Sequence, residues 1–292
     1  MGRRNKLFKG LTHPLNNDII TNVRKEGQII MNIIVFDTET ISINKPYCYD
    51  LGYVVYNTET EQILVKRSFV IEQVWNNKPL FNTAYYSNKR PLYVSSMRGR
   101  RSELIKYGFA QQKMIRDIQQ YQVVGAYAFN SKFDDGVFEF NADKYGCKNA
   151  LDTIPIYDIR GYAMNYLADG SYKEFCDNNE DIKSADGTSK KFITDADGYK
   201  TTAESFYSYL IDDANYNEEH TALADSLIEL EILRACVKKG AAWQTEYNCA
   251  RSIPRNIPKT LMVKVDGKLD YQVQYMKKVE RKNTDGVVIS LT

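Results

Sequence analysis

A short apolar run followed at once by acidic residues constrains this chain more than any other feature. The run from Ile33 to Phe36 is typical of a buried strand, and Asp37 and Glu39 come directly after it. Side chains in extended backbone alternate between two faces, so these two carboxylates share one face. Paired carboxylates are ligands for a hard divalent cation such as Mg²⁺ or Mn²⁺. An isolated Asp-x-Glu also fits a strand end with two solvated acids, so this segment alone decides nothing.

The remaining periodic segments predict an α/β sheet domain flanked by helices. Apolar runs at 53–56 and 63–70 are separated by the polar residues 57–61, which is typical of a hairpin. The other expected elements are strands over 123–127 and 154–157, and helices over 102–120, 135–145, 158–167 and 218–238.

Other parts of the chain do not follow this pattern. Residues 72–100 look irregular, and 169–200 look like a long polar insertion loop. We therefore expect a basic N-terminal arm over 1–30, a domain over 31–238 that contains the insertion, and a C-terminal extension over 239–292. Residues 285–291 read as a turn and a strand within that extension.

Charge is unevenly distributed along the 292 residues, although the net charge is only +2. Residues 1–30 carry a net charge of +4 and residues 236–292 a net charge of +6, whereas the segment between them carries −8. An acidic centre suits a carboxylate metal site. Basic flanks suit a polyanion such as nucleic acid, and solubility alone is an equal explanation.

Cysteine usage and hydropathy bound the cellular setting. The five cysteines form no CxxC pair and leave an odd count, which argues against a zinc ribbon or a disulfide framework and favours a reducing compartment. No apolar run approaches the ~18 residues needed to cross a membrane. The basic N-terminus is not followed by the apolar stretch of a signal peptide. We expect a cytoplasmic protein with no membrane partner.

A second acidic residue follows a predicted strand. Asp134 comes after the strand over 123–127, in a turn that Phe133 would anchor in the core. In that arrangement Asp134 faces the same site as the first two acids. The alternative, which fits this residue alone at least as well, is capping of the next helix by Asp134 or Asp135.

His220 and Asp225 stand at the start of the strongest predicted helix. Five residues are about 1.4 turns, so the two side chains would be offset by about 140° and lie on adjoining faces. The aspartate can bind metal, while a neutral histidine near pH 7 can take a proton from water. A lone histidine at a helix start is otherwise an ordinary exposed polar residue.

Taken together and in this order, the motifs resemble those of the DEDDh group of 3′→5′ exonucleases, which includes the proofreading and RNase T-like enzymes on the ribonuclease H-like fold. The resemblance covers residues 31–238. It rests on 36–40, 129–134 and 220–225, and the four residues between His220 and Asp225 mark the histidine subtype. Residues 49–54 are similar to the second strand of that family, with Asp50 where glutamate is usual.

The resemblance implies a set of roles. Asp37, Glu39 and Asp225 would hold one divalent ion, Mg²⁺ or Mn²⁺. Asp37 would bridge to a second ion, with Asp134 assisting through water. His220 would deprotonate the attacking water, and a nucleoside 5′-monophosphate would leave. Substrate contacts are expected from Thr40, Ile41, Phe129 and Asn130.

The sequence therefore predicts a mixed ribonuclease H-like sheet flanked by helices and a metal-dependent 3′→5′ exonuclease. Its substrate would be the 3′ end of single-stranded nucleic acid, DNA in preference to RNA, in a bacterial or phage-infected cytoplasm. Two alternatives stay open. One is a proofreading subunit whose residues 239–292 bind a polymerase or another replication protein. The other is a non-catalytic nucleic-acid-binding module on the same fold.

Overall fold

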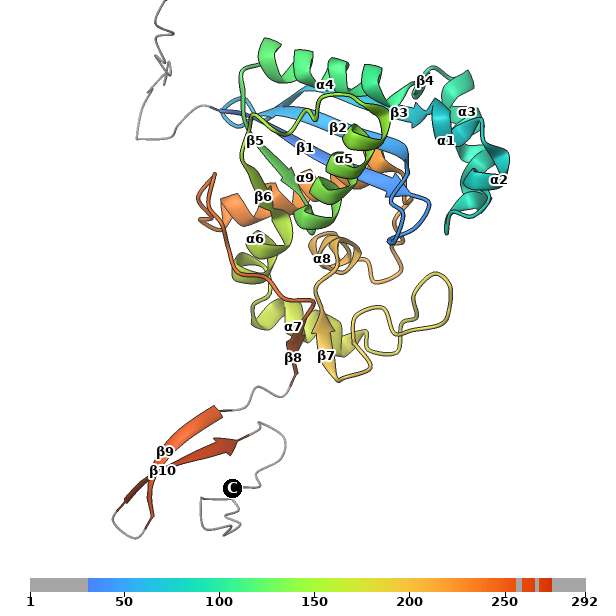
Figure 1. Ribbon diagram of the computed structural model, residues 1–292. Helices are drawn as coiled ribbons and strands as arrows, with labels where there is room; N and C mark the ends of the chain where they lie inside the picture. The colour runs from blue at the N-terminus through green and yellow to red at the C-terminus, as the bar shows by residue number, and fades with distance from the viewer. Residues whose placement is uncertain (1–30, 256–258, 266–267, 275–292) are drawn as a thin grey trace, which may run out of the picture.

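The computed structural model describes residues 31–255 and, for the backbone, 259–265 and 268–274. Its centre is a six-stranded sheet in the order β4-β3-β2-β1-β5-β6 (Figure 1). Strand β2 runs antiparallel to both of its neighbours, while the other neighbouring pairs are parallel. The strands are β1 (Asn32–Thr40), β2 (Cys48–Asn57), β3 (Gln62–Ile71), β4 (Glu103–Ile105), β5 (Val123–Ala128) and β6 (Ile156–Asp158). The predicted ribonuclease H-like mixed sheet is confirmed.

Helices cover both faces of the sheet (Figure 1). On one face α9 packs on β1, β2 and β3, and α6 and α8 pack against α9. Helices α4 and α5 lie on the other face. The helices are α1 (Glu72–Trp75), α2 (Lys78–Phe81), the 3₁₀ helix η1 (Ser87–Lys89), α3 (Arg90–Arg98), α4 (Tyr107–Gln120), α5 (Ser131–Tyr145), α6 (Ile159–Tyr166), α7 (Gly170–Asn178), α8 (Ala203–Leu210) and α9 (Ala222–Lys238). Two small antiparallel pairs complete the description: β7 (Gly198–Lys200) with β8 (Ser252–Pro254), and β9 (Lys259–Val265) with β10 (Lys268–Gln274).

Alternation along β1 divides the core into two layers. Ile33 and Val35 are buried in the cluster that includes α9, whereas Ile34 and Phe36 are buried in the cluster that includes α4 and α5. Strand β1 continues to Thr40 rather than ending before Asp37, so the period of two extends through the acidic residues. Asp37 and Glu39 therefore share the face that α9 covers.

Helix α9 approaches β2 most closely at Gly52. A Cβ atom added to Gly52 would lie 2.1 Å from the backbone nitrogen of Leu223 and 2.2 Å from the carbonyl carbon of Ala222. The Ser226 hydroxyl also donates to the Gly52 carbonyl at 3.1 Å. Only a residue without a side chain lets the first turn of α9 rest on the strand.

We expect Gly52→Ala to destabilise the fold by about 1–3 kcal/mol or more, because backbone atoms of α9 must move to accommodate the methyl group. Urea denaturation measures the effect as a lower midpoint. Gly136→Ala is the matched control, since a Cβ there meets nothing within 4 Å and the position lies within α5. The control should be neutral or slightly stabilising. Equal midpoints for the two variants would contradict the close approach.

Two expectations about residues 72–120 are wrong. The segment 72–100 is mostly helical, as α1, α2, η1 and α3, because Phe81 and Tyr93 pack their rings against Tyr49 of β2 and Trp75 packs against Phe81. Its apolar residues serve this separate cluster and so show no regular local period. The expected helix over 102–120 begins only at Tyr107. Residues 103–105 instead extend the sheet as β4, paired in parallel with the edge of β3.

The expected insertion loop over 169–200 is also partly ordered into regular structure. Helix α7 lies within it and is capped by Asp169, whose carboxylate accepts from the backbone N–H groups of Ser171 and Tyr172. The same segment ends in β7, which pairs with β8.

Residues 241–255, placed in the C-terminal extension by the sequence, pack on the main body. The backbone N–H of Gln244 donates to the Tyr127 hydroxyl, and Arg255 forms ion pairs with Asp177, Glu180 and Asp197. The expected N-terminal arm over 1–30 and the turn and strand over 285–291 lie outside the described residues. The domain boundaries themselves stay predictions.

Among the helices that the structure describes, none has both the length and the apolar character needed to span a bilayer.

Candidate active site

The turn after β5 brings Asp134 to the end of β1. Asn130 adopts a left-handed conformation, φ +65°, that asparagine tolerates better than most residues and that turns the chain into α5. Its backbone N–H donates to Asp158 and its side-chain oxygen accepts from Arg160. The first turn of α5 then places the Asp134 carboxylate under β1.

Asp134 does not cap its helix, which was the alternative that the sequence left open. Its Oδ1 instead accepts from both the backbone N–H and the hydroxyl of Thr38, at 3.1 and 2.6 Å. Asp134 is buried, with 3% of its surface exposed. These bonds fix the carboxylate beside the acidic end of β1.

Asp50 fixes the start of α9. Its Oδ2 accepts from the backbone N–H of Ala222 and from the hydroxyl of Tyr93, both at 2.9 Å. A carboxylate at this position satisfies one of the unpaired N–H groups of the first turn and suits the positive end of the helix dipole. The side chain of Thr221, the N-cap residue, makes no capping bond.

The helix therefore starts at Ala222, and the expectation that it starts at residue 218 with His220 on its surface is wrong. His220 lies in the preceding loop in a left-handed conformation, φ +49°. The offset of about 140° around a helix axis does not describe its relation to Asp225. The loop conformation positions the imidazole instead.

The structure brings three of the five predicted catalytic residues into one compact group. Ligand atoms of Glu39, His220 and Asp225 all lie within 4.8 Å of one another. Asp37 and Asp134 adjoin this group, since the charge of Asp134 raises the pKa of Asp37 and the charge of Asp37 raises that of Asp225. Segments more than 180 residues apart in the chain thus supply one acidic site.

Burial and mutual repulsion hold these carboxyl groups toward their protonated forms. Burial raises the pKa of Asp37, Glu39 and Asp225 well above the usual range, and neighbouring carboxylates raise it further. The pKa of Asp134 rises to about 7, also through burial, although its bonds from Thr38 lower it. Lys89 is the cation that opposes the rise at Glu39 and Asp225.

This donor set fits divalent cations. Asp37 Oδ2 and Asp225 Oδ1 are buried and make no hydrogen bond with any described residue. Buried polar atoms of that kind require a partner, and oxygen atoms of clustered carboxylates are the ligands that Mg²⁺ and Mn²⁺ prefer. Asp37, Glu39, Asp134 and Asp225 are the residues that would hold such ions.

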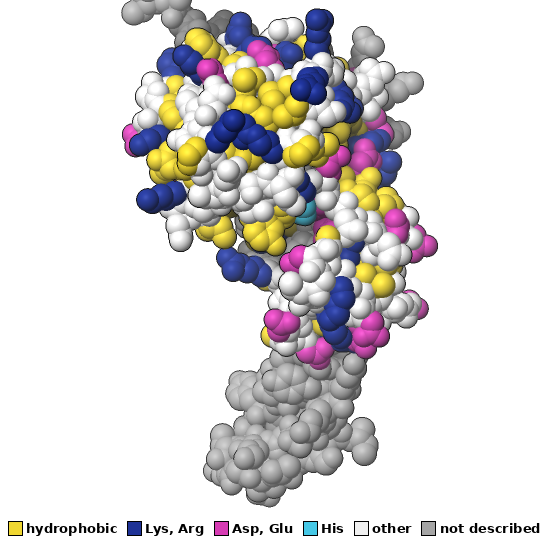
Figure 2. All heavy atoms as spheres, turned by 90° about the vertical axis from the view of Figure 1, so that its right-hand side faces the viewer, with side chains coloured by type: hydrophobic (Ala, Val, Ile, Leu, Met, Phe, Trp, Pro, Cys, Tyr) yellow, Lys and Arg dark blue, Asp and Glu magenta, His cyan; other side chains and the backbone are white. Residues whose placement is uncertain are grey.

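His220 is packed on one ring face, and one of its nitrogens lies near a carboxyl group. Tyr86 stacks on the imidazole with ring centroids 4.4 Å apart and an interplanar angle of 15°. Nδ1 lies 3.6 Å from Glu218 Oε2, which leaves Nε2 as the nitrogen available to water. Burial, followed by the charge of Lys89, lowers the pKa of His220 to about 4, so the ring is neutral near pH 7. In Figure 2 the histidine side chain, in cyan, lies in a recess of this face beside charged side chains.

Several residues that support the site were not among the residues predicted from the sequence. Lys89 donates to the Glu219 carbonyl and lies over the Tyr86 ring, so η1 and the residue before it hold the His220 loop. Glu229 accepts from the backbone N–H of Phe129 at 3.2 Å. Its position four residues after Asp225, within a leucine-rich helix, is a signal that would have identified it. No local pattern identifies Tyr86 or Lys89.

The four predicted substrate contacts divide into two pairs. Ile41 and Phe129 are buried, at 6% and 8% exposure, and belong to core clusters. Thr40 and Asn130 are partly exposed. The roles of all four toward substrate stay predictions.

The raised carboxyl pKa values give a testable dependence of stability on pH. In a cation-free protein, groups whose pKa is higher in the folded state stabilise the fold when protonated, and that contribution is lost as pH rises through the folded pKa. Asp50 at about 6, Asp134 at about 7 and Glu218 at about 8 place the loss between about pH 4 and pH 8. In EDTA we expect the melting temperature to fall from about pH 5 to about pH 8 by at least ~2–4 °C.

Added Mg²⁺ or Mn²⁺ should raise the melting temperature more at about pH 8 than at about pH 5, because ionised carboxylates bind the ions more tightly. Differential scanning calorimetry with and without the ion measures both effects. The ion-dependent part should shrink in Asp37→Asn. A melting temperature in EDTA that stays level or increases with pH would contradict the charge arrangement described above.

No protein-family model and no curated protein matches this chain. Two solved structures that it resembles are E. coli Exonuclease I in complex with a dA16 oligonucleotide and the same enzyme in complex with a dT13 oligonucleotide. The first match has 11% sequence identity over 71% of this chain, and the second has 14% over 72%, each with a TM-score of 0.42. This chain spans only 41% of the length of each Exonuclease I chain. Similarity at this level carries no argument about activity, which depends on the side chains described above.

Proposed function

We propose that this protein is a metal-dependent 3′→5′ exonuclease that removes nucleoside 5′-monophosphates from the 3′ end of single-stranded nucleic acid, DNA in preference to RNA. The observation that supports the proposal is the convergence of Glu39, His220 and Asp225, with Asp37 and Asp134 adjoining them. A structural acidic cluster has no need of a partly buried, neutral histidine beside it. In phosphodiester hydrolysis the carboxylates can hold the ions and the histidine can take the proton of water.

Each part of the site has a task in that reaction. The four carboxylates would hold divalent ions, which when bound would supply positive charge that lowers the pKa of water and stabilises charge on phosphate oxygens. His220 accepts the proton of the attacking water at Nε2. Tyr86, stacked on the imidazole, keeps the ring oriented for that transfer. The water oxygen forms a bond to phosphorus, the bond from phosphorus to the 3′ oxygen breaks, and that oxygen takes a proton from solvent to become the new 3′ hydroxyl.

The test is digestion of oligonucleotides by purified protein with Mg²⁺ or Mn²⁺. A strand labelled at its 5′ end should become progressively shorter, whereas a 3′ label should be released at once as a mononucleotide. EDTA should stop both reactions. Matched single-stranded DNA, single-stranded RNA and duplex DNA compared side by side decide the substrate. Endonucleolytic fragments, or release of a 5′ label as the first product, would refute the proposed direction.

The same experiment separates the alternatives. A non-catalytic nucleic-acid-binding module would bind these strands and leave them intact. A proofreading subunit would digest them and, in addition, bind a polymerase or another replication protein. That partner stays a prediction, because most of its expected contact region over 239–292 lies outside the residues whose side chains are described.

A further inference from the structure

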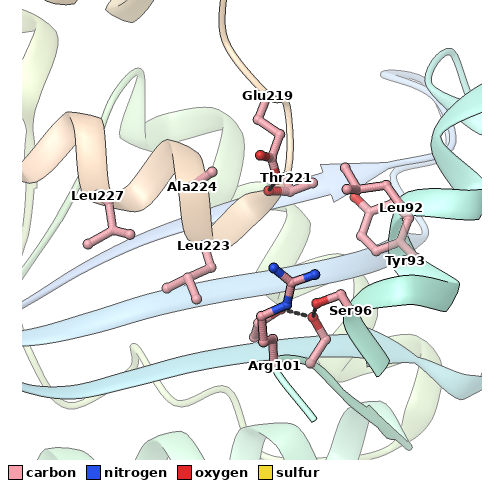
Figure 3. Close-up of a pocket in the computed structure, with 11 residues that line it drawn as sticks. Leu92, Tyr93, Ser96, Arg101, Glu219, Thr221, Leu223, Ala224 and Leu227 are labelled. Atoms are coloured by element: carbon pink, nitrogen blue, oxygen red, sulfur yellow. Dashed lines mark hydrogen bonds between the residues drawn. The ribbon is translucent and has the colours of Figure 1, made fainter. Parts of the chain in front are cut away.

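A cavity of about 210 Å³ lies beside the candidate active site, between α3 and the start of α9 (Figure 3). Leu223 and Leu227 of α9 form one wall, and Leu92 of α3 lies across from them. Glu219 and Thr221, the two chain neighbours of His220, close one end. Consecutive Cα atoms are 3.8 Å apart, so the pocket directly adjoins the loop that carries His220.

The polar side chains of the pocket form few hydrogen bonds and ion pairs with other described residues. Figure 3 shows the Arg101 guanidinium directed into the space between Leu223 and Ser96. Among the described residues, this guanidinium forms no hydrogen bond and no ion pair. At the opposite end the Glu219 carboxylate accepts from the Thr221 hydroxyl at 3.0 Å, and within the described part of the chain its own oxygens form no ion pair. The pocket therefore offers a strong donor and a strong acceptor that do not bind each other.

Hydroxyl groups supply a further donor. Ser68, Ser96 and Ser102 form a chain in which the Ser102 oxygen lies 2.7 Å from that of Ser68 and 2.6 Å from that of Ser96. Three hydroxyls carry three hydrogens, and the two bonds between them use two. One hydrogen remains for a bound group.

We propose that this pocket binds one unpaired base of the strand whose end is hydrolysed, with guanine preferred. The inference rests on the proposed function. Apolar leucine walls suit the faces of an unpaired base, because contact with them removes apolar surface from water. Arginine pairs with O6 and N7 of guanine, and a carboxylate on the other side accepts from the N–H groups of its Watson–Crick edge. Thymine offers a single ring N–H and no amino group, so it satisfies Glu219 less well.

The charge distribution favours a base over a backbone phosphate. A phosphate would accept from Arg101 and the serine hydroxyls, but it would bring a second negative charge toward Glu219. It would also leave the leucine walls without a partner. The volume suits a single base, since pockets for whole drug-sized ligands are larger, roughly 300–1,000 Å³.

The experiment places one variable nucleotide in an oligothymidine strand and moves it position by position from the 3′ end. Guanine, thymine and an abasic site are compared at each position. Binding is measured by fluorescence anisotropy with the full chain carrying Asp37→Asn, and single-turnover cleavage is measured with the otherwise unaltered chain. Arg101→Ala tests the pocket. Arg98→Ala is the matched control, since it removes another exposed arginine that does not line the cavity.

At one position we expect guanine to bind at least about fivefold more tightly than an abasic site. Arg101→Ala should abolish that difference, while Arg98→Ala keeps it. Equal binding of guanine, thymine and abasic strands at every position overturns the proposal. It is also overturned if Arg101→Ala weakens all strands alike, because that result indicates a phosphate contact. Binding does not require cleavage, so a protein that digests no strand refutes the proposed function without deciding the pocket's preference for guanine in the anisotropy series.

Discussion

Asp37→Asn is expected to reduce exonuclease activity by about a thousandfold or more, because the residues of such a site act as a unit. Asp37 lies on the face of β1 that α9 covers, and its Oδ2 has no hydrogen-bond partner among the described residues. Asparagine keeps the shape of the side chain and removes the charge that a divalent ion needs. Initial rates on a 5′-labelled strand at saturating Mg²⁺ measure the loss.

The same substitution should not unfold the protein. Asp37 is surrounded by the charges of Asp134, Glu39 and Asp50, each of which raises its pKa. Burial and these neighbouring charges favour an uncharged side chain at this position, so the neutral asparagine should leave the melting temperature in EDTA unchanged or higher. Glu59→Gln, at the exposed turn between β2 and β3, removes the same charge far from the site and should retain full activity. Digestion by Asp37→Asn at the rate of the unaltered protein would show the assignment to be wrong.

His220→Ala is expected to reduce turnover by about 10²- to 10⁴-fold, the usual contribution of a general base. Ion binding should persist, because the carboxylates that would hold the ions remain. The melting-temperature increase produced by Mn²⁺ at about pH 8 is therefore expected to be retained in this variant and reduced in Asp37→Asn. The two substitutions separate proton transfer from ion binding.

The pH dependence of the remaining rate distinguishes a lost base from a disturbed loop. Without His220, hydroxide must replace the base, so the rate of the variant should increase with pH. In the unaltered protein the pKa of His220 is about 4, so the base stays unprotonated at neutral pH. Asn217→Ala alters the same loop at an exposed position and should cause little change. Loss of the Mn²⁺-dependent stabilisation in His220→Ala would instead make the histidine a metal ligand.

The acidic part of the site could be predicted from sequence because it depends on local periodicity. The period of two along β1 places Asp37 and Glu39 on one face, and the turn after β5 delivers Asp134 to the same edge of the sheet. Asp225 belongs to a helix whose leucine spacing is plain. Each of these inferences uses only residues that are close together in the chain.

The environment of His220 could not be predicted in this way. The leucine spacing predicts a helix over 218–238 but does not define the residue at which it begins. The Asp50 carboxylate, 172 residues earlier in the chain, fixes the first residue of the helix at Ala222 by accepting a hydrogen bond from its backbone N–H. Tyr86 and Lys89, which hold the histidine loop, belong to a segment whose own sequence looks irregular.

The sequence by itself determined the order of the candidate site residues and the sheet that holds the acids, since strand and helix periods are local properties. Only the tertiary structure decided where the histidine stands, which way its ring faces and what lies beside it. Those features depend on contacts between segments more than 100 residues apart, and such contacts leave no periodic trace in either segment.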